Sequence, residues 1–400
     1  MSHPDHTLTS KRIPERDMYF TSDSLLPENQ QPLMITVAPF GAQWLPADYT
    51  QDIAVSWKDQ VQKAVDCYNA GATVLHVRVR DPQTGHISKS FAEYCDFIGM
   101  LRHAVPRMIL QLGGSISLAP ESEEQADWQG YDTRHLLTEI EPRPDQVTIA
   151  LGTTQMNPLS LTTPDDVQGT RFADPVIRNE YQNMIVDAAP AFYIEHLKRL
   201  RAHGIQPYFA TAHIHHLEEI EHLIRTGVYM GPVNHTLTAI GGSGFCGRNP
   251  FDFFEYLRRS PDGSVMTMES IWRTVAPFAA MAIALGVHIR CGIEDNLWNR
   301  KGERMSSAQQ VDQIVRLAKE LKRAVATGDN ARELSKLGVW YNSAEETLDA
   351  LGLPPNRKDG QLGFVVKETD GKLRGATAGS DGHALAEQIG AASARSGAEG

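Results

Sequence analysis

Short apolar segments alternate with amphipathic helical patterns along most of this chain, and this alternation limits the fold more than any other feature. About eight apolar segments have the length and composition of buried strands; they are residues 33–37, 73–79, 108–112, 146–151, 205–210, 229–237, 265–268 and 288–293. Strands that alternate with helices pair in parallel, because each helix returns the chain to the same end of the sheet. The sequence therefore predicts an α/β fold built on a parallel sheet.

The length of the alternating region favours a closed sheet. A (β/α)8 barrel, or TIM barrel, takes about 250 residues, and this region offers roughly 290. No Gly-x-Gly-x-x-Gly motif follows the first strand, which weakens the alternative of an open, doubly wound sheet that binds a dinucleotide. We predict a TIM barrel with an N-terminal arm, loop insertions and a C-terminal helical extension.

Helical periodicity and turn residues divide the rest of the chain. Helices are predicted at residues 57–70, 91–103, 189–203, 217–225, 250–259 and 275–285, with a long exposed helix at 307–326 and another at 330–337. Residues 153–175 are expected to form a long polar loop. We divide the chain into a polar arm (1–30), a barrel domain (31–340) and an extension that ends in a mobile tail rich in Gly, Ala and Ser (341–400).

Charge and cysteine content exclude several classes of function. The chain has 38 Lys and Arg against 49 Asp and Glu, a formal charge of −11, which disfavours adhesion to nucleic acid or anionic lipid. No apolar run approaches the roughly 18 residues of a membrane-spanning helix, and residues 1–20 lack the apolar segment of a secretory signal. Four scattered cysteines without a Cys-x-x-Cys motif indicate a reduced, cytoplasmic protein.

Polar side chains collect near the carboxyl ends of the predicted strands, where TIM barrels place their chemistry. They are His76, Arg78 and Arg80; Gln111 and Ser115; Thr148; His213, His215 and His216; Asn234 and His235; and Arg290, Glu294 and Asp295. Each has a structural explanation, since a strand histidine is more often a core residue than a ligand and adjacent acidic residues often cap a helix. Buried charge is unfavourable unless it is paired. Its recurrence at one end of successive strands therefore favours a functional site.

Two parts of the sequence resemble the β-keto acid cleavage enzymes, the family that includes 3-keto-5-aminohexanoate cleavage enzyme. The first comprises Ile-Thr-Val-Ala-Pro-Phe-Gly-Ala at 35–42 and His-Val-Arg-Val-Arg-Asp-Pro at 76–82. The more specific is Gly-Val-His-Ile-Arg-Cys-Gly-Ile-Glu-Asp-Asn at 286–296, and the resemblance extends over residues 32–340. It implies a TIM barrel with a divalent metal, typically zinc, that converts a β-keto acid and acetyl-CoA into acetoacetate and a new acyl-CoA.

The resemblance also implies roles for matching positions. His76 and Glu294 match two metal ligands, while Arg290 and Asp295 match the pair that handles proton transfer, with Asp295 as the general base. A divalent ion would stabilise the substrate enolate as a Lewis acid. Arg290 would orient the base and offset developing negative charge.

Three further positions complete the predicted site. Ser115 matches a catalytic-site serine of the family, and Thr148 matches a residue that lines the substrate pocket. Gln43 stands where the family has a glutamate, and residues 208–213 replace an acidic segment of the fifth strand. Because these replacements remove negative charge, we expect either a more anionic substrate or a site that functions without metal.

Arg78 is the departure with the largest consequence, because the family has a second metal-binding histidine at this position. A guanidinium has no lone pair to offer a metal. Either His213 or His215 supplies a third ligand in a His/His/Glu zinc site, or no metal binds and Arg78 holds the substrate carboxylate through two hydrogen bonds. The presence of both His76 and Glu294 gives a slight preference for a retained Zn²⁺.

We therefore predict a cytoplasmic acyltransferase that cleaves C–C bonds, with a β-keto acid and a CoA thioester as its small-molecule partners. No nucleic-acid or membrane partner is expected, and the resemblance implies a homo-oligomer, specifically a homotetramer. One alternative is a metal-dependent hydrolase on a TIM barrel, which would not require CoA. Another is a non-catalytic, ligand-binding relic of the family, suggested by the missing metal histidine.

Overall fold

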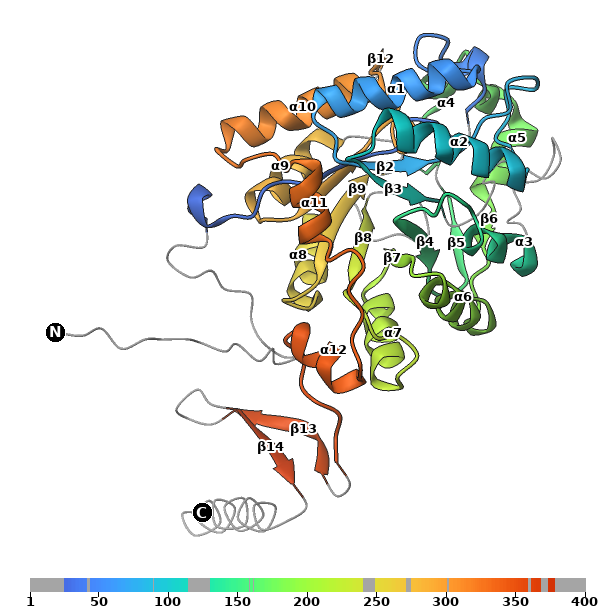
Figure 1. Cartoon of the computed structure of the whole chain (residues 1–400). Helices are drawn as coiled ribbons and strands as arrows, with labels where there is room; N and C mark the ends of the chain where they lie inside the picture. Colours follow the sequence, from blue (N-terminus) through green and yellow to red (C-terminus); the bar gives the residue numbers. More distant parts are fainter. Residues whose placement is uncertain are drawn as a thin grey trace.

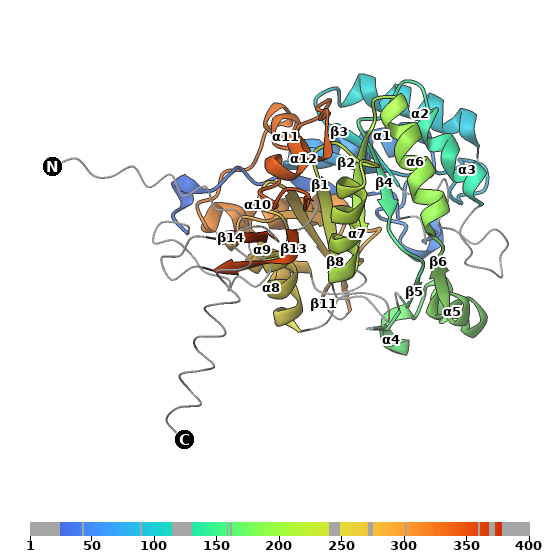
Figure 2. The ribbon, with the colours of Figure 1, turned by 90° about the horizontal axis from the view of Figure 1, so that it is seen from below.

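In the computed structural model of the protein, eight parallel strands of the described residues form a closed barrel with the spatial order β1-β10-β9-β8-β7-β4-β3-β2 (Figures 1 and 2). The structure describes residues 25–41, 44–88, 90–113, 130–157, 159–160, 162–239, 249–270, 275–300, 302–358, 361–367 and 373–377. The barrel strands are β1 (Ile35–Val37), β2 (Val74–Val77), β3 (Ile109–Leu112), β4 (Gln146–Ala150), β7 (Gln206–Thr211), β8 (Asn234–Ala239), β9 (Val265–Ser270) and β10 (His288–Cys291). The predicted TIM barrel is confirmed.

Helices follow the barrel strands and surround them (Figure 2). They are α1 (Trp57–Ala70), α2 (Phe91–Ala104), α3 (Tyr131–His135) with the 3-10 turn η3 (Leu136–Thr138), α6 (Pro190–Ala202), α7 (Ile214–Arg225), α8 (Pro250–Arg259), α9 (Val275–Ala284) and α10 (Ser307–Glu320). Ser56 begins α1 by accepting a hydrogen bond from the backbone N–H of Asp59, and Gly71 ends it in a left-handed conformation. Both boundaries match the sequence prediction.

Side chains alternate between the two faces of each barrel strand. In β2, Leu75 and Val77 belong to the hydrophobic core between the sheet and its helices. His76 therefore points into the barrel, and Arg78 lies on the same side two residues later. The strand register places Gln111 of β3 beside His76. The barrel is thus apolar on its outside and polar along this part of its interior.

Two sequence predictions about individual segments are wrong. The predicted exposed helix at 307–326 is α10, which ends at Glu320 and buries Gln310, Val311, Ile314 and Ala318. It packs against α1 and α9 as the last helix of the barrel. The predicted loop at 153–175 contains secondary structure, namely β5 (Thr154–Met156), α4 (Pro164–Val167) and η4 (Arg171–Ala173), followed by α5 (Pro175–Gln182) and β6 (Met184–Val186). The segment is structured because β5 pairs with β6 and its apolar side chains pack in a hydrophobic cluster separate from the main core.

The segment after α10 closes the amino-terminal end of the barrel. Val325 pairs with Leu33 just before β1, and the Arg323 guanidinium donates hydrogen bonds to four backbone carbonyls, those of Gln31, Ile283, Gly286 and Val287. The remaining elements are η1 (Pro27–Asn29), η2 (Pro46–Asp48), β11 (Trp298–Arg300), β12 (Glu303–Arg304), α11 (Gly328–Leu334), α12 (Ala344–Ala350) and the hairpin β13 (Gln361–Lys367) with β14 (Leu373–Thr377). The division at residues 30 and 340 stays a prediction, and most of the predicted tail lies outside the described residues.

No helix in the described part of the chain combines the length and the apolar character that crossing a bilayer requires. The cysteines that the structure describes, Cys67, Cys95 and Cys291, are free thiols. Burial raises the pKa of the Cys67 thiol to about 12, so this thiol stays protonated and unreactive near neutral pH.

Candidate active site

The loop after β10 carries the two acidic residues predicted for the site, and neighbouring elements hold it in place. Gly292 has a φ of +123°, and a side chain there would collide with the backbone carbonyl of Ala38. The N–H of Gly292 donates to Gln310 Oε1 at 2.9 Å, and the N–H of Glu294 donates to the Ala38 carbonyl at 3.1 Å. The ends of β1 and α10 therefore determine where Glu294 and Asp295 lie.

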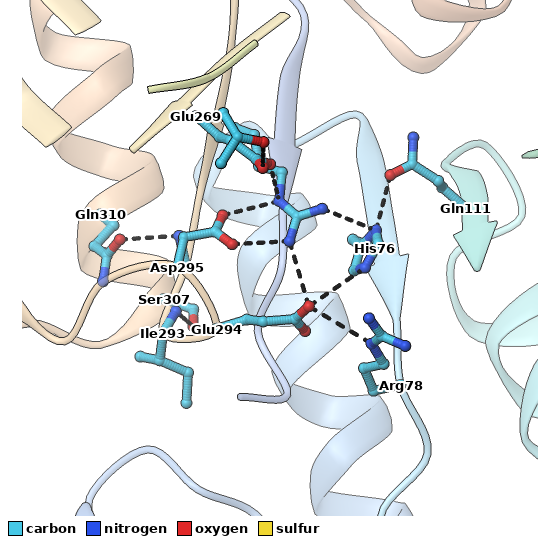
Figure 3. A network of polar contacts seen from close by, with 12 residues as sticks. His76, Arg78, Gln111, Glu269, Ile293, Glu294, Asp295, Ser307 and Gln310 are labelled. Carbon is cyan, nitrogen blue, oxygen red and sulfur yellow. Dashed lines mark hydrogen bonds and ion pairs between the residues drawn. The ribbon is translucent and has the colours of Figure 1, made fainter. Parts of the chain in front are cut away.

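Arg290 of β10 lies at the centre of a buried ionic cluster. Figure 3 labels its partners Glu269, Glu294 and Asp295. Its Nε and Nη2 atoms donate to the two carboxylate oxygens of Asp295 at 2.9 and 2.8 Å, a bidentate pair. Nε also lies 2.9 Å from Glu269 Oε2, and Nη2 lies 3.3 Å from Glu294 Oε1. The single guanidinium thus shares its positive charge among three carboxylates, one at the end of β9 and two in the loop after β10.

Glu294 connects this cluster to β2. Its Oε1 atom lies 3.4 Å from His76 Nε2 and 3.5 Å from Arg78 Nε, besides the contact with Arg290. All four side chains are at least nine-tenths buried. The predicted convergence of the second and last barrel strands at one end of the barrel is therefore present in the structure (Figure 3).

A chain of three buried glutamines runs from His76 to the closed end of the barrel. Gln206 Nε2 donates to the backbone carbonyl of Ser335 at 2.9 Å, so its Oε1 accepts from Gln146 Nε2 at 2.7 Å. Gln146 Oε1 in turn accepts from Gln111 Nε2 at 3.0 Å, which leaves Gln111 Oε1 2.8 Å from His76 Nδ1. A carbonyl only accepts hydrogen bonds, so the direction of the whole chain is set at Ser335.

The neighbours of His76 place opposite demands on its Nδ1 atom. Gln111 Oε1 can only accept a hydrogen bond there, whereas Arg290 Nη1, 3.1 Å away, can only donate one, and the carboxylate of Glu294 faces Nε2. Burial and the nearby Arg290 lower the pKa of His76, so the ring is neutral. The fixed positive charge of Arg290 thus opposes a second proton on the ring.

Replacing Gln146 by leucine tests the glutamine chain. The variant leaves Gln111 Nε2 without its acceptor and Gln206 Oε1 without its donor, so we expect about 1–3 kcal/mol lower stability in urea unfolding. Because Gln111 is then free to rotate, kcat should fall as well. Gln155→Leu, at an exposed glutamine, is the control and should change neither quantity. Full stability and full kcat in Gln146→Leu would show that the chain does not orient His76.

The two acidic neighbours differ in their ionisation. Burial raises the pKa of Asp295 to about 7, and the negative charges of Glu269 and Glu294 add to this rise while Arg290 opposes it. Burial would also raise the pKa of Glu294, but Arg78, His76 and Arg290 together hold it well below its usual range. Glu294 is therefore a permanent anion, whereas Asp295 exchanges its proton near neutral pH.

The other predicted residues lie in different places. The Thr148 hydroxyl of β4 is buried without a hydrogen-bond partner among the described residues, and Thr148 pairs in register with Tyr208 of β7. His213 precedes α7, where its ring stacks on that of His215 at a centroid distance of 5.2 Å. Ser115 and Gln43 lie outside the described residues.

The residues present do not fit the predicted metal. In the described ranges, no three His, Cys, Asp or Glu side chains are placed to hold an ion, so His213 does not complete a set with His76 and Glu294. In place of a third metal ligand, Arg78 lies beside Glu294, with its Nε atom 3.5 Å from Oε1. A guanidinium about 4 Å from a bound divalent ion would repel it by about 8 kcal/mol at an effective dielectric constant near 20. The structure thus favours the second of the two alternatives left open by the sequence.

Glu269 and the two glutamines Gln146 and Gln206 were not predicted from sequence as part of the site, whereas Gln111 was. The strand containing Glu269 was expected to end at Met268, whereas β9 continues to Ser270. Glu269 accepts a hydrogen bond from the Thr238 hydroxyl at 2.6 Å and contacts Arg290. The alternation of Thr267 and Glu269 with Met266 and Met268 was the signal that could have revealed it.

A closed barrel with a buried cluster of arginines and carboxylates at the carboxyl ends of its strands has the architecture of a TIM-barrel enzyme. A model of the beta-keto acid cleavage enzyme family matches residues 32–337. The chain belongs to this family, as the resemblance predicted.

Sequence relatives agree with this assignment, and a solved structure shares the fold. The chain is 27% identical over 311 residues to 3-keto-5-aminohexanoate cleavage enzyme from Acetoanaerobium sticklandii, covering 77% of this chain and 98% of the relative. It is 24% identical over 298 residues to 3-dehydrocarnitine:acetyl-CoA trimethylamine transferase from Rhizobium meliloti, covering 71% and 90%. The binary complex of ObcA with oxaloacetate has a similar fold, with a TM-score of 0.52 and 14% identity over 72% of this chain and 68% of that one.

Proposed function

We propose that the protein transfers an acyl group from a β-keto acid to CoA, with acetyl-CoA as co-substrate and acetoacetate as the second product. The bidentate Arg290–Asp295 pair carries this proposal, because it presents a carboxylate base of pKa about 7 inside a buried site. Such a base suits the removal of a proton from carbon next to a carbonyl at neutral pH. Membership of the family and the acetyl-CoA transferases among the relatives support the same reaction.

The reaction begins when Asp295 removes a proton from C2 of the β-keto acid. The resulting enolate carbon attacks the thioester carbonyl of acetyl-CoA, forming a C–C bond and expelling the CoA thiolate. The thiolate then attacks the original keto carbonyl, and the bond from that carbon to C2 breaks. These steps release the acyl-CoA and the enolate of acetoacetate, which takes back the proton held by Asp295.

We expect protein side chains to stabilise the negative charge that develops on the substrate during these steps. Arg290 keeps Asp295 oriented and lies beside the developing enolate charge. Arg78 would hold the substrate carboxylate through its fixed positive charge. The buried hydroxyl of Thr148 would donate a hydrogen bond to a substrate oxygen, which would satisfy it.

A substrate panel tests the proposal. Purified protein is incubated with acetyl-CoA and β-keto acids that carry anionic, neutral or cationic side chains, and the acyl-CoA and acetoacetate are measured by mass spectrometry. We expect turnover with at least one acid, fastest with an anionic one, and none when acetyl-CoA is omitted. Cleavage without acetyl-CoA would favour a hydrolase instead. Binding of keto acids without turnover by any of them would favour a ligand-binding protein.

The cytoplasmic location and the homotetramer stay predictions. Sedimentation equilibrium of the full chain measures the second directly.

A further inference from the structure

We infer that this protein binds its β-keto acid without a metal ion, and that the Arg78 guanidinium provides the positive charge that an ion would bring to His76 and Glu294. The identity of the substrate rests on the proposed function. The metal content of the protein does not, so the two conclusions can fail separately.

The first observation concerns the atoms that an ion would need. Glu294 Oε1, the carboxylate oxygen on the side of His76, faces Arg78 Nε at 3.5 Å and Arg290 Nη2 at 3.3 Å, so an ion bound to this oxygen would lie beside two positive charges. The neutral ring of His76 also lies beside this oxygen, with Nε2 3.4 Å from it. Two donor atoms next to two fixed cations make a poor site for a further positive charge.

The second observation is that Gly113, just after β3, leaves space that the Arg78 guanidinium fills. A Cβ atom on Gly113 would overlap Cζ, Nη1 and Nη2 of Arg78, so the side-chain position of residue 113 is occupied by the guanidinium itself. The backbone of Gly113 does not have the positive φ that would by itself require glycine. Close packing of Arg78 is therefore the reason for a glycine at this position.

The third observation concerns what a guanidinium can do at position 78 in place of the histidine of the family. A guanidinium stays charged at every physiological pH and matches a carboxylate with two parallel N–H donors. Arg78 is held at its Nε end by Glu294, and the planar end of the side chain lies over Gly113 at the carboxyl end of the barrel. It would thus hold a carboxylate in a defined orientation, as required for a β-keto acid whose C2 proton must face a base.

Metal analysis tests the inference whether or not a reaction is found. The full-length protein, purified without chelator and then incubated with excess Zn²⁺ and desalted, should retain less than about 0.1 equivalent of metal, whereas Arg78→His should retain about one equivalent held by three ligands. His76→Ala in the Arg78→His background should lose it again. One equivalent of metal in the wild type, lost in His76→Ala, would overturn the inference. Failure of Arg78→His to gain zinc would also overturn it, because Arg78 would then not be what excludes the ion.

Gly113→Ala separately tests whether the position of the Arg78 guanidinium matters for binding. The added methyl group should displace the guanidinium while leaving its charge in the protein, so we expect at least tenfold weaker binding of acetoacetate in calorimetric titration and still no metal. Gly99→Ala is the matched control, because a Cβ there meets only Pro142, at an ordinary contact distance of 3.7 Å. Unchanged acetoacetate binding in a folded Gly113→Ala variant would contradict the assignment of Arg78 as the carboxylate anchor.

Discussion

Asp295→Asn is expected to lower kcat by about 10²–10⁴-fold, the usual contribution of a positioned general base. Asparagine preserves the shape of the side chain but cannot take the C2 proton. It also offers one oxygen where Arg290 now finds two, so its amide N–H₂ would face an N–H of the guanidinium. Steady-state kinetics should show the loss mainly in kcat, since Arg78 and Thr148 remain to bind the substrate.

The pH dependence of the wild type provides a second measurement of the same group. Asp295 acts as a base only when it is ionised, and its pKa is raised to about 7, so kcat should rise as the pH increases through 7 and then level off. This pKa exceeds that of an unfolded aspartic acid, so the folded state binds the proton more tightly. The contribution of Asp295 to stability is therefore full below about pH 4 and is lost as the pH rises towards 7.

Asp145→Asn is the matched control for this prediction. Asp145 also pairs with two arginines, Arg102 and Arg332, but it lies just before β4 at the opposite end of the barrel. Its replacement should lower stability and leave the midpoint of the kcat profile near pH 7. A pH profile of Asp295→Asn with the wild-type midpoint and amplitude would show that another group is the base.

Arg290→Met is expected to lower the free energy of unfolding by about 3–5 kcal/mol and to abolish activity. The substitution preserves much of the apolar volume but leaves Glu269 and Asp295 without the guanidinium that they share. Glu294 keeps Arg78, so the loss should fall on the other two carboxylates. Urea unfolding followed by circular dichroism measures the change.

Two comparisons separate charge from packing in this prediction. In Arg290→Met the guanidinium no longer opposes the rise in the pKa of Asp295, so the variant should lose more stability than the wild type as the pH rises from 4 to 7. Arg323→Met removes an equally buried arginine whose partners are neutral backbone carbonyls, and its loss of stability should not depend on pH in this range. Equal and pH-independent losses in both variants would show that Arg290 acts only through packing.

Local patterns in the sequence were enough for most of the architecture. Alternating apolar runs and helical periodicity predicted the barrel, because a strand buried on one face and an amphipathic helix have distinct periods that do not depend on distant residues. The prediction was wrong for α10, where the exposed-looking pattern includes Gln310 and Ser307. These polar residues are buried because they hydrogen-bond the loop after β10, a partner that lies outside the local sequence.

The sequence by itself determined five residues of the site, His76, Arg78, Arg290, Glu294 and Asp295, from their positions at the ends of predicted strands, although it did not reveal Glu269. Only the tertiary structure decided what they do to one another. Whether Arg78 excludes a metal, which acid keeps its proton at neutral pH and whether the ring of His76 is charged depend on distances of about 3–4 Å between strands that are far apart in the chain. Electrostatic energies and hydrogen-bond directions vary steeply over such distances, and no local pattern encodes them.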